Sequence, residues 1–467
     1  MLLRRVSVPF VMLLLSGCVV GPDYQKPDMP LPTKFSEGST KSDGDVTQTA
    51  WWTSFNDSQL NAYVDKGLAQ NLDILQAVEA IAQAQEGIIT ATAGAYPSVD
   101  LTGSDAVGSS AGEAASTSAH KLTNTATGSI PVSWYLDLFG KYKRAGEAAE
   151  AQLGQAYASA DVARLALISN LVQAYVNARL YQERLQIAKS NLASRRETLK
   201  LTQFQLDAGA SSRLDVAQSE GLVNAQLSSI PGLEASYRAQ VYSLSTLMGL
   251  PAATLIDQMN KKKPIPMTSA TYASGVPADL IRNRPDIRKA EQALAAATAN
   301  IGVSEAALYP SITLSGTVTA SLSASHLAGS NGLTSWSFGP ALSLPIFDGG
   351  ALRANVRINE SQARAAYLAW QQTVLDAISE VETALAKVSR DGRTVSALRA
   401  TVASYKEALD LSTASYKDGA TSLLDVLDAQ RSVSSAEADL ADAVASMAND
   451  YVSLNVAIGG GYAVGSK

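Results

Sequence analysis

The chain contains two copies of one pattern, about 210 residues apart. The segments Asn71–Ser98 and Arg284–Ser311 align without a gap at an offset of 213 residues, and each ends in Tyr-Pro-Ser. A second match relates Gly209–Val216 to Gly419–Val426 at an offset of 210 residues. This repeat is far longer than the roughly 20–50-residue period of solenoid proteins. The sequence therefore predicts two similar halves that build one object with internal pseudo-symmetry.

Residues 1–17 have the features of a bacterial lipoprotein signal peptide. Two arginines, at positions 4 and 5, precede an apolar stretch of ten residues, Val6–Leu15, which is too short to span a membrane. The stretch leads into a Leu-Ser-Gly-Cys lipobox, whose last residue, Cys18, would take the diacylglyceryl group. Cys18 is the only cysteine, so an intrachain disulfide is excluded. We predict that acylated Cys18 anchors the mature chain to lipid. Val19 in the place of an aspartate favours the outer membrane.

Charge and hydropathy restrict the ways in which this chain can use a membrane. Removal of the signal changes the formal net charge from −6 to −8, and no basic patch indicates nucleic acid. No later run of 18 apolar residues exists, so the sequence predicts no spanning helix. A membrane crossing must therefore use strands.

Proline is absent from two long segments, Val132–Ile230 and Ile346–Lys467. Such segments permit very long helices. In them, apolar residues recur at steps of three, four and seven, as in Leu165, Ile168 and Val172, which is coiled-coil spacing. At about 1.5 Å per residue, a helix of some 65 residues is about 100 Å long, the scale of a structure that bridges a compartment. The predicted helices are 72–94, 140–207, 212–249, 285–307, 350–417 and 421–458.

Segments between the short and the long helices alternate small or polar residues with apolar ones. We predict strands at 98–107, 125–136, 311–321 and 334–344, each about as long as a tilted transmembrane strand. The loops 108–124 and 322–333 are rich in Ser, Gly and Ala, and the aromatic residues Trp134, Tyr135, Trp336 and Phe338 would form an interface girdle. Four strands cannot close into a barrel, and an open edge is not tolerated in lipid. The chain must therefore oligomerise, and strand geometry alone permits two copies or three.

These elements predict the following organisation of the chain. A lipid-anchored segment, 18–70, precedes the first repeat, 71–249, which contains a β-hairpin at 98–136 and a long helical hairpin at 140–249. A linker, 250–283, leads to the second repeat, 284–458, with a β-hairpin at 311–344 and a helical hairpin at 350–458. Residues 459–467 form a tail.

Signals for other functions are weak. Residues Gly108–Gly112 match the G-x-S-x-G pattern of hydrolases, but a Ser/Ala-rich loop follows where that motif needs a helix. The two histidines, His120 and His326, lack metal-site spacing. No Walker or Rossmann pattern is present, so any energy must come from a partner. A coiled-coil lipoprotein that spaces the cell envelope would need no strands. We therefore predict no enzymatic activity, no metal and no cofactor.

Several ordered motifs resemble those of TolC-type outer-membrane efflux proteins. They run from the lipobox to about residue 458, and the likeness is strongest to the lipoprotein branch (OprM-like, NodT) that serves resistance-nodulation-division pumps. The motifs are Gly17–Pro27, Trp51–Leu60, Asn283–Leu294, Tyr309–Gly316 and Leu342–Ala354.

The resemblance implies an α+β, mainly α, fold that assembles as a homotrimer. Three chains would form a twelve-stranded outer-membrane barrel, continuous with a long periplasmic α-helical barrel. Residues 19–70, 250–283 and the tail would form an equatorial region. The implied function is a passive duct that exports small molecules, with a periplasmic adaptor protein and an inner-membrane resistance-nodulation-division transporter as partners. The alternative is the duct of a type I protein secretion system.

The turns between the long helices are candidate contact sites. Gly209 and Gly419 stand where a left-handed residue would end the incoming helix. Either of two serines in the first turn, and either Thr421 or Ser422 in the second, would cap the outgoing helix. The resemblance implies that these tips contact the adaptor; the alternative is that they are only turns. The tip residues are Gly209, Ala210, Ser211, Ser212, Gly419, Ala420, Thr421 and Ser422.

The sequence also offers candidates for a gate, namely Leu424, Asp425 and Asp428, which follow the second tip. Leu424 and Asp428 share a helix face, with Asp425 beside them. The resemblance implies that they narrow the periplasmic mouth, where a trimer would have rings of three. Carboxylate rings select or bind cations, and apolar rings block passage by dewetting. Composition alone favours another interpretation, in which Asp425 and Asp428 only form the solvated face of the first turn of the helix that follows the tip.

The resemblance also implies a hydrogen-bonded lock at the mouth. Asp215 and Tyr416 match two of its members, whereas the arginine that completes it is replaced by Thr421. A Tyr416–Asp215 hydrogen bond would be the surviving element. Opening would then shift the second helical hairpin against the first.

Overall fold

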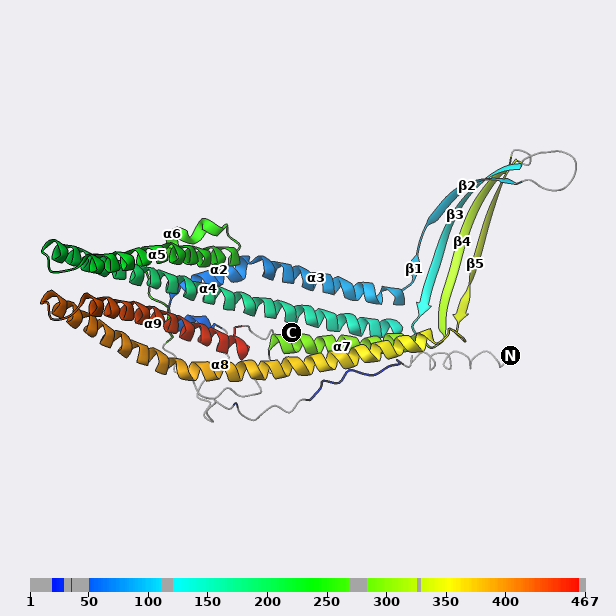
Figure 1. The fold of residues 1–467 in the computed structure, drawn as a ribbon. Coiled ribbons are helices and arrows are strands. Elements are labelled where there is room, and N and C mark those ends of the chain that lie inside the picture. Colours follow the sequence, from blue (N-terminus) through cyan, green and yellow to red (C-terminus); the bar gives the residue numbers. More distant parts are fainter. Residues whose placement is uncertain are drawn as a thin grey trace. The chain divides into compact units, whose positions relative to one another are not determined.

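Figure 1 shows the protein in a computed structural model, which describes residues 19–28, 35, 50–110, 121–268, 284–325 and 329–461. Cys18, His120 and His326 lie outside the described residues. Contact clustering divides the chain into two compact units. Unit 1 comprises 1–28, 80–157 and 289–371, and unit 2 comprises 29–79, 158–288 and 372–467. Each unit therefore contains residues from both repeats, and the two 67-residue helices, 141–207 and 351–417, are each divided between the units. The two compact units are thus not the two repeats.

The helices predicted from proline spacing and periodicity are present, with ends within two residues of those expected. Further short helical elements lie at Trp51–Phe55, which includes the Trp51-Trp52 pair (the Trp-Trp motif), and in the linker after residue 250. The helical elements are η2 (Trp51–Phe55), α2 (Ser58–Gln70), α3 (Leu72–Thr92), η3 (Ala93–Ala95), α4 (Lys141–Asp207), α5 (Arg213–Leu247), η4 (Ala252–Leu255), α6 (Ile256–Met259), α7 (Pro285–Ala306), α8 (Ala351–Lys417) and α9 (Leu423–Ala457). None of the described helices is long and apolar enough to cross a membrane.

The core of unit 2 is aromatic and lies around the Trp-Trp motif. Trp51, Trp52 and Phe55 of η2 are buried, and Tyr451 of α9 meets Trp51 and Phe55 edge-on, with ring centroids 6.2 and 5.4 Å apart. Edge-to-face contact adds to the free energy gained by burying the rings. This core holds the segment before α2 against the long helices.

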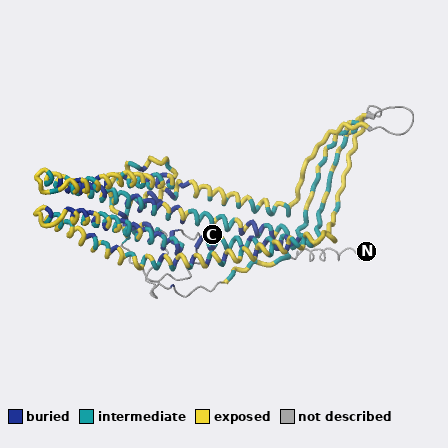
Figure 2. Tube along the Cα trace, viewed as in Figure 1, coloured by how far each residue is buried: buried dark blue, intermediate teal, exposed yellow. Residues whose placement is uncertain are grey.

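Periodicity along α4 correctly identifies the face that packs into this core. Leu165, Ile168, Val172 and Tyr175 are all buried, as their spacing predicts. Figure 2 shows buried and exposed residues alternating along the long helices, as expected for amphipathic elements. The Tyr175 hydroxyl also donates a 2.6 Å hydrogen bond to Asp57, which caps α2.

Unit 1 contains one antiparallel sheet. Its strands are β1 (Ser98–Val99), β2 (Thr102–Ser110), β3 (Lys121–Leu136), β4 (Ser311–Ser325) and β5 (Gly329–Ser343). β3 pairs with β4, β4 with β5, and both β1 and β2 pair with the other side of β3. Among the described strands, β5 and the β1–β2 edge are thus each paired on one side only.

The strands run further than the sequence predicts. β3 has 16 residues and β4 and β5 have 15 each, so the predicted loop 322–333 is largely strand, and strand also extends into both described ends of the predicted loop 108–124. The prediction was wrong because their Ser- and Gly-rich composition is typical of loops, whereas ladder hydrogen bonds use the backbone and tolerate small side chains.

The first predicted strand is divided in two by a proline on its neighbour. Val99 pairs with Val132 and Thr102 with Ser129, so the register is unbroken across the gap. Pro131 faces the gap and has no N–H to donate, although its carbonyl accepts from Asp100 at 3.1 Å. β1 and β2 therefore act as one edge.

An N-terminal strap, defined here as residues 19–28, lies on unit 1 and is held by the buried Arg144 of α4. The Arg144 guanidinium donates to the carbonyls of Val20 and Gly21, both at 3.0 Å, and to the Asp23 carboxylate at 2.8 Å. Gly21 also lies against Gly302 of α7, so closely that a side chain at Gly21 would clash. The strap thus ties residues 19–28 to helices from both repeats.

Candidate functional site: the tips of the helical hairpins

Both helical hairpins turn through the same motif, and both tips belong to unit 2. Gly209 and Gly419 have left-handed φ angles of 75° and 72°, as predicted. In the first tip, the Ala210 N–H donates to the Gln205 carbonyl at 2.8 Å and the Gly209 N–H to the Leu206 carbonyl at 2.9 Å. The second tip repeats both bonds at equivalent positions. This Schellman arrangement satisfies the last carbonyls of the incoming helix.

The outgoing helix of the first hairpin, α5, begins with a capping box. Ser212, rather than Ser211, is the cap, and the Asp215 N–H donates to its hydroxyl at 3.2 Å. The Asp215 carboxylate accepts from the N–H and hydroxyl of Ser212 at 2.9 and 2.7 Å, and from the Ser211 hydroxyl at 3.0 Å. These bonds, the backbone one first, lower the pKa of Asp215.

The second hairpin begins α9 in the same way. Ser422, rather than Thr421, is the cap, and its N–H and hydroxyl donate to the Asp425 carboxylate at 3.1 and 2.9 Å. Asp215 and Asp425 therefore have the same local role in the two repeats. All the predicted tip residues are exposed except Ser211, which is half-buried.

The predicted Tyr416–Asp215 hydrogen bond is absent. The Tyr416 hydroxyl is buried and has no hydrogen-bond partner among the described residues. Its ring packs in a small core with Leu423 and Leu427. The Asp215 carboxylate instead accepts local bonds from Ser211 and Ser212, all at one of its oxygens, and such local bonds cost little chain entropy.

The predicted gate residues are exposed on the outer side of that small core. Leu424 retains 52% of its exposure, and Asp425 and Asp428 are also exposed, whereas Val426 and Leu427 are buried behind them. The face predicted for α9 is therefore the solvent-accessible one, and it presents one apolar and two acidic side chains.

Two arginines near this face were missed by the sequence reasoning. Arg431 lies one turn after Asp428 and forms a 2.9 Å ion pair with it. The i,i+3 spacing could have revealed this pair. The other, Arg195 of α4, is buried and donates to the Leu222 carbonyl at 3.0 Å; burial, and then the charge of Arg431, lower its pKa. No local pattern marks Arg195, because its burial depends on packing between helices.

The chemistry available at the tips is limited to charge, apolar contact and hydrogen bonding. No group of three or more His, Cys, Asp or Glu that could hold a metal occurs in the described part of the chain. Exposed carboxylates and leucines on two similar hairpins suit a contact surface or a constriction.

Comparison with known proteins agrees with the fold and with the duplication. The model of the outer membrane efflux protein family matches residues 63–250 and 276–460, one stretch for each repeat. This chain belongs to that family. The match covers both helical hairpins and both tips.

Curated relatives cover almost the whole chain. Nodulation protein T of Rhizobium leguminosarum bv. trifolii is 51% identical over 458 residues, which are 98% of this chain and 97% of the relative. The cation efflux system protein CusC of Escherichia coli K12 is 32% identical, over 97% of this chain and 99% of the relative. Outer membrane protein OprJ of Pseudomonas aeruginosa is also 32% identical, over 98% and 96%.

Solved structures share the fold. The outer-membrane channel OprN superposes with a TM-score of 0.84 at 30% identity, covering 95% of this chain and 99% of the channel. The open state of the Neisseria gonorrhoeae MtrE outer membrane channel gives 0.80 at 27% identity, over 95% and 98%.

Proposed function

We propose that this protein is the outer-membrane duct of a tripartite efflux pump, a passive channel that exports small molecules. The family match over both repeats is the observation that carries the proposal. Relatives named as outer membrane proteins of solvent and toluene efflux pumps, each 32% identical, support it. The duct performs no chemistry, and its energy comes from an inner-membrane partner.

The assembly that we propose is a homotrimer. Each chain supplies a sheet whose described outer edges, β5 and β1–β2, are unpaired. Unpaired backbone groups cannot remain in lipid, so edges of neighbouring chains must pair. Counting β1–β2 as one edge, three chains give twelve strands, and the family resemblance favours three over two.

Lipid anchoring through Cys18 completes the attachment to the outer membrane. The signal sequence supports this proposal, and so does the strap, whose bonds to Arg144 hold the residues that follow Cys18. In the proposed complex the hairpin tips contact a periplasmic adaptor protein, which joins the duct to a resistance-nodulation-division transporter. The names of the relatives include cations, solvents and toluene, which fits substrates chosen by the transporter.

The gate that we propose consists of Leu424, Asp425 and Asp428 at the exposed face of α9. Tyr416 supports it by packing behind this face, and Asp215 shapes the neighbouring tip by capping α5. Single-channel conductance in planar bilayers tests the assignment, because Asp425→Ala with Asp428→Ala should raise it. Asp207→Ala, which removes an exposed carboxylate at the end of α4 that caps no helix, is the matched control and should leave conductance unchanged. Equal conductance in the double variant and the wild type would refute the gate.

The function itself is tested in cells and in membranes. A deletion strain should become sensitive to several unrelated toxic compounds, and the wild-type gene should restore resistance. The purified protein should migrate as a heat-labile trimer and should conduct ions. Restored resistance without a conducting oligomer would contradict the proposal.

A further inference from the structure

The two β-hairpins meet their long helices through matching junctions. The junction after β3 reads Leu-Asp-Leu-Phe, residues 136–139, and the junction after β5 reads Leu-Pro-Ile-Phe, residues 344–347. The residue before each long helix is a glycine with positive φ, 76° at Gly140 and 87° at Gly350. Phe139 and Phe347 therefore hold equivalent positions in the two repeats.

Phe139 stacks on a tyrosine of the other repeat. Its ring centroid lies 4.7 Å from that of Tyr309, with 19° between the ring planes. Tyr309 begins the Tyr-Pro-Ser of the second repeat, just before β4. The pair continues the register of β3 and β4, because Leu136 lies opposite Ile312 and each aromatic residue lies three positions beyond. The end of the first hairpin is thus joined to the start of the second.

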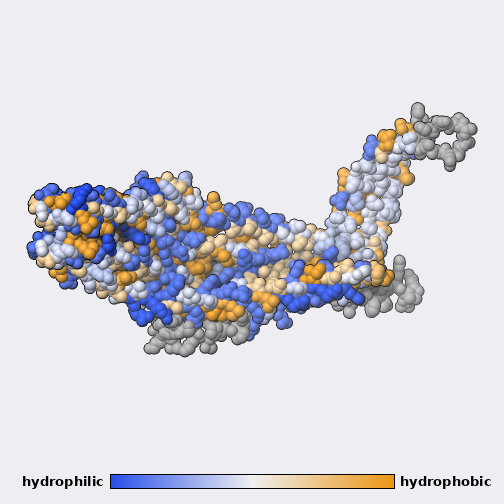
Figure 3. Space-filling model, viewed as in Figure 1, coloured by the Kyte–Doolittle hydropathy of each residue, from blue (hydrophilic) through white to orange (hydrophobic). Residues whose placement is uncertain are grey.

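The equivalent residues at the outer ends of the two hairpins are exposed. Phe347 retains 92% of its exposure, as does Ile346 beside it, whereas Phe139 is half-buried. Tyr96, which begins the Tyr-Pro-Ser of the first repeat, retains 69%. Figure 3 shows apolar surface where the strands meet the long helices. Exposed apolar clusters of this kind mark surfaces that another molecule covers.

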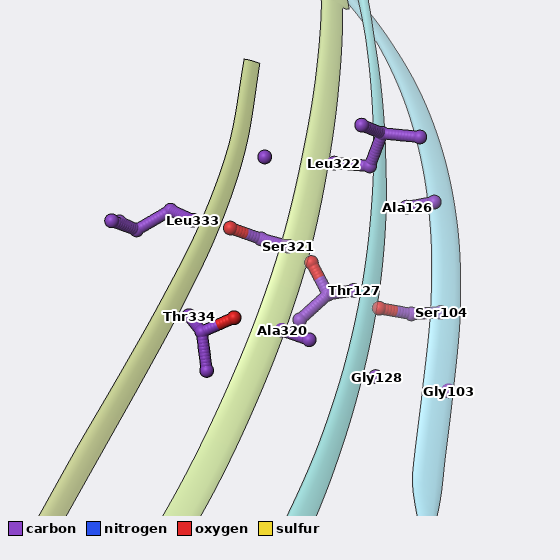
Figure 4. Close-up of a pocket in the computed structure, with 11 residues that line it drawn as sticks. Gly103, Ser104, Ala126, Thr127, Gly128, Ala320, Ser321, Leu322, Leu333 and Thr334 are labelled. Carbon is purple, nitrogen blue, oxygen red and sulfur yellow. The ribbon is translucent and has the colours of Figure 1, made fainter.

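The two free edges of the sheet lie beside these exposed rings. β5 leads to Phe347, and the β1–β2 edge follows Tyr96. Figure 4, drawn around a shallow cavity of about 510 Å³, shows both edges, with Ser104 on β2 at one side and Leu333 on β5 at the other. A second copy of the chain presents each edge with the other one.

We propose that Phe347 stacks on Tyr96 of the next copy, so that the contact inside the chain is repeated between chains. This inference rests on the proposed homotrimer. A cyclic assembly of chains with two similar halves has two kinds of junction, from the first repeat to the second within a chain and from the second to the first between chains. Applying the β3–β4 register to the second kind also places Ser343 opposite Asp100 of the next copy.

The chemistry of the two edges supports this register independently. It places Leu342 opposite Leu101 and Trp336 opposite Val107 of the next copy, and all four side chains are exposed in the single chain. Apolar pairs of this kind across neighbouring strands stabilise a sheet. A slip of one residue would instead place these side chains opposite the other face of the neighbouring edge. A slip of two residues would keep the faces but separate the aromatic pair.

Two cysteine pairs compare the proposed contact with the contact inside the chain. Tyr96→Cys with Phe347→Cys tests the proposal, and Phe139→Cys with Tyr309→Cys is the matched control. Cys18 is the sole native cysteine, so the wild type and each single variant show whether it reacts. Oligomers purified in detergent are treated with dibromobimane, a short reagent that fluoresces after it bridges two thiols. They are then denatured and separated on gels.

The expected result for the first pair is fluorescent bands of covalent dimers and trimers, which the single variants lack. The control pair should fluoresce at the monomer position alone. Native trimers that yield only monomer bands from the first pair would overturn the inference, and would mean that Phe347 faces lipid.

A second pair leaves both rings in place, in case their removal prevents assembly. Leu342→Cys with Leu101→Cys should also give covalent dimers and trimers. Leu342→Cys with Gly103→Cys should bridge about tenfold less, because diagonal neighbours lie about 7–8 Å apart. Equal or stronger bridging of this slipped pair would overturn the register. Absence of native trimers in the wild type would instead refute the proposed homotrimer itself.

Discussion

Replacing Tyr416 by phenylalanine separates two accounts of the second tip. The Tyr416 hydroxyl is buried and has no hydrogen-bond partner among the described residues. Leaving such a group unsatisfied costs about 1–3 kcal/mol relative to its hydrated state. Tyr416→Phe should therefore raise the local free energy of opening by about 1 kcal/mol, since part of the gain is lost to the small void left by the oxygen.

A matched control is available in the same unit. The Tyr175 hydroxyl donates to the Asp57 carboxylate at 2.6 Å and accepts from Arg179 at 3.2 Å. Bonds to charged groups contribute about 1.5–3 kcal/mol, so Tyr175→Phe should destabilise its surroundings by that amount. The same chemical change should thus have opposite signs at the two positions.

Amide hydrogen exchange measured by mass spectrometry reports local opening and suits this comparison. Peptides that cover residues 409–427 should exchange about fivefold more slowly in Tyr416→Phe, since about 1.4 kcal/mol corresponds to tenfold. Peptides around Tyr175 should exchange faster in Tyr175→Phe. Faster exchange at the tip together with a higher conductance in Tyr416→Phe would show that the hydroxyl makes a stabilising bond, and would refute our reasoning.

Three further predictions concern other features of the chain. Gly419→Ala should destabilise the second tip by about 1 kcal/mol, because φ is positive at this position. Gly221→Ala should stabilise the protein, because Gly221 lies within α5, where a methyl group meets no other atom and alanine favours the helix. Thermal melts in detergent compare the two variants. Burial, and then a neighbouring carboxylate, raise the pKa of Asp391 from 3.8 to about 6. The folded state therefore holds this proton more tightly than the unfolded state does. The free energy of unfolding should fall as the pH rises from about 4 to about 6. Asp391→Asn should therefore melt higher than the wild type at pH 7.5 but not at pH 4, and equal gains at both would contradict this linkage. Arg144→Ala should release the strap and speed chymotrypsin cleavage after the half-buried Tyr24, which unchanged cleavage would disprove.

Local patterns predicted much of this fold correctly. The long helices, their glycine stops and their serine caps depend on residues within one or two turns of each other, so sequence spacing identifies them. The periodic face of α4, from Leu165 to Tyr175, is buried as predicted. Strand length was underestimated because Ser- and Gly-rich segments are typical of loops, yet their backbone can also form the hydrogen bonds of a β-ladder.

The sequence by itself determined the duplication, the long helices, the tip turns and the exposed face that carries Leu424 and Asp428, since each follows from interactions between near neighbours in the chain. Only the tertiary structure decided that the hydroxyl of Tyr416 is buried and that the guanidinium of Arg195 is buried. It also decided that Arg144 binds a strap more than 120 residues before it in the chain. The reason is physical: the cost of burying a polar group depends on which distant elements surround it. Asp57 shows both parts: near neighbours in the chain make it a helix cap, whereas its bond from Tyr175 depends on tertiary packing.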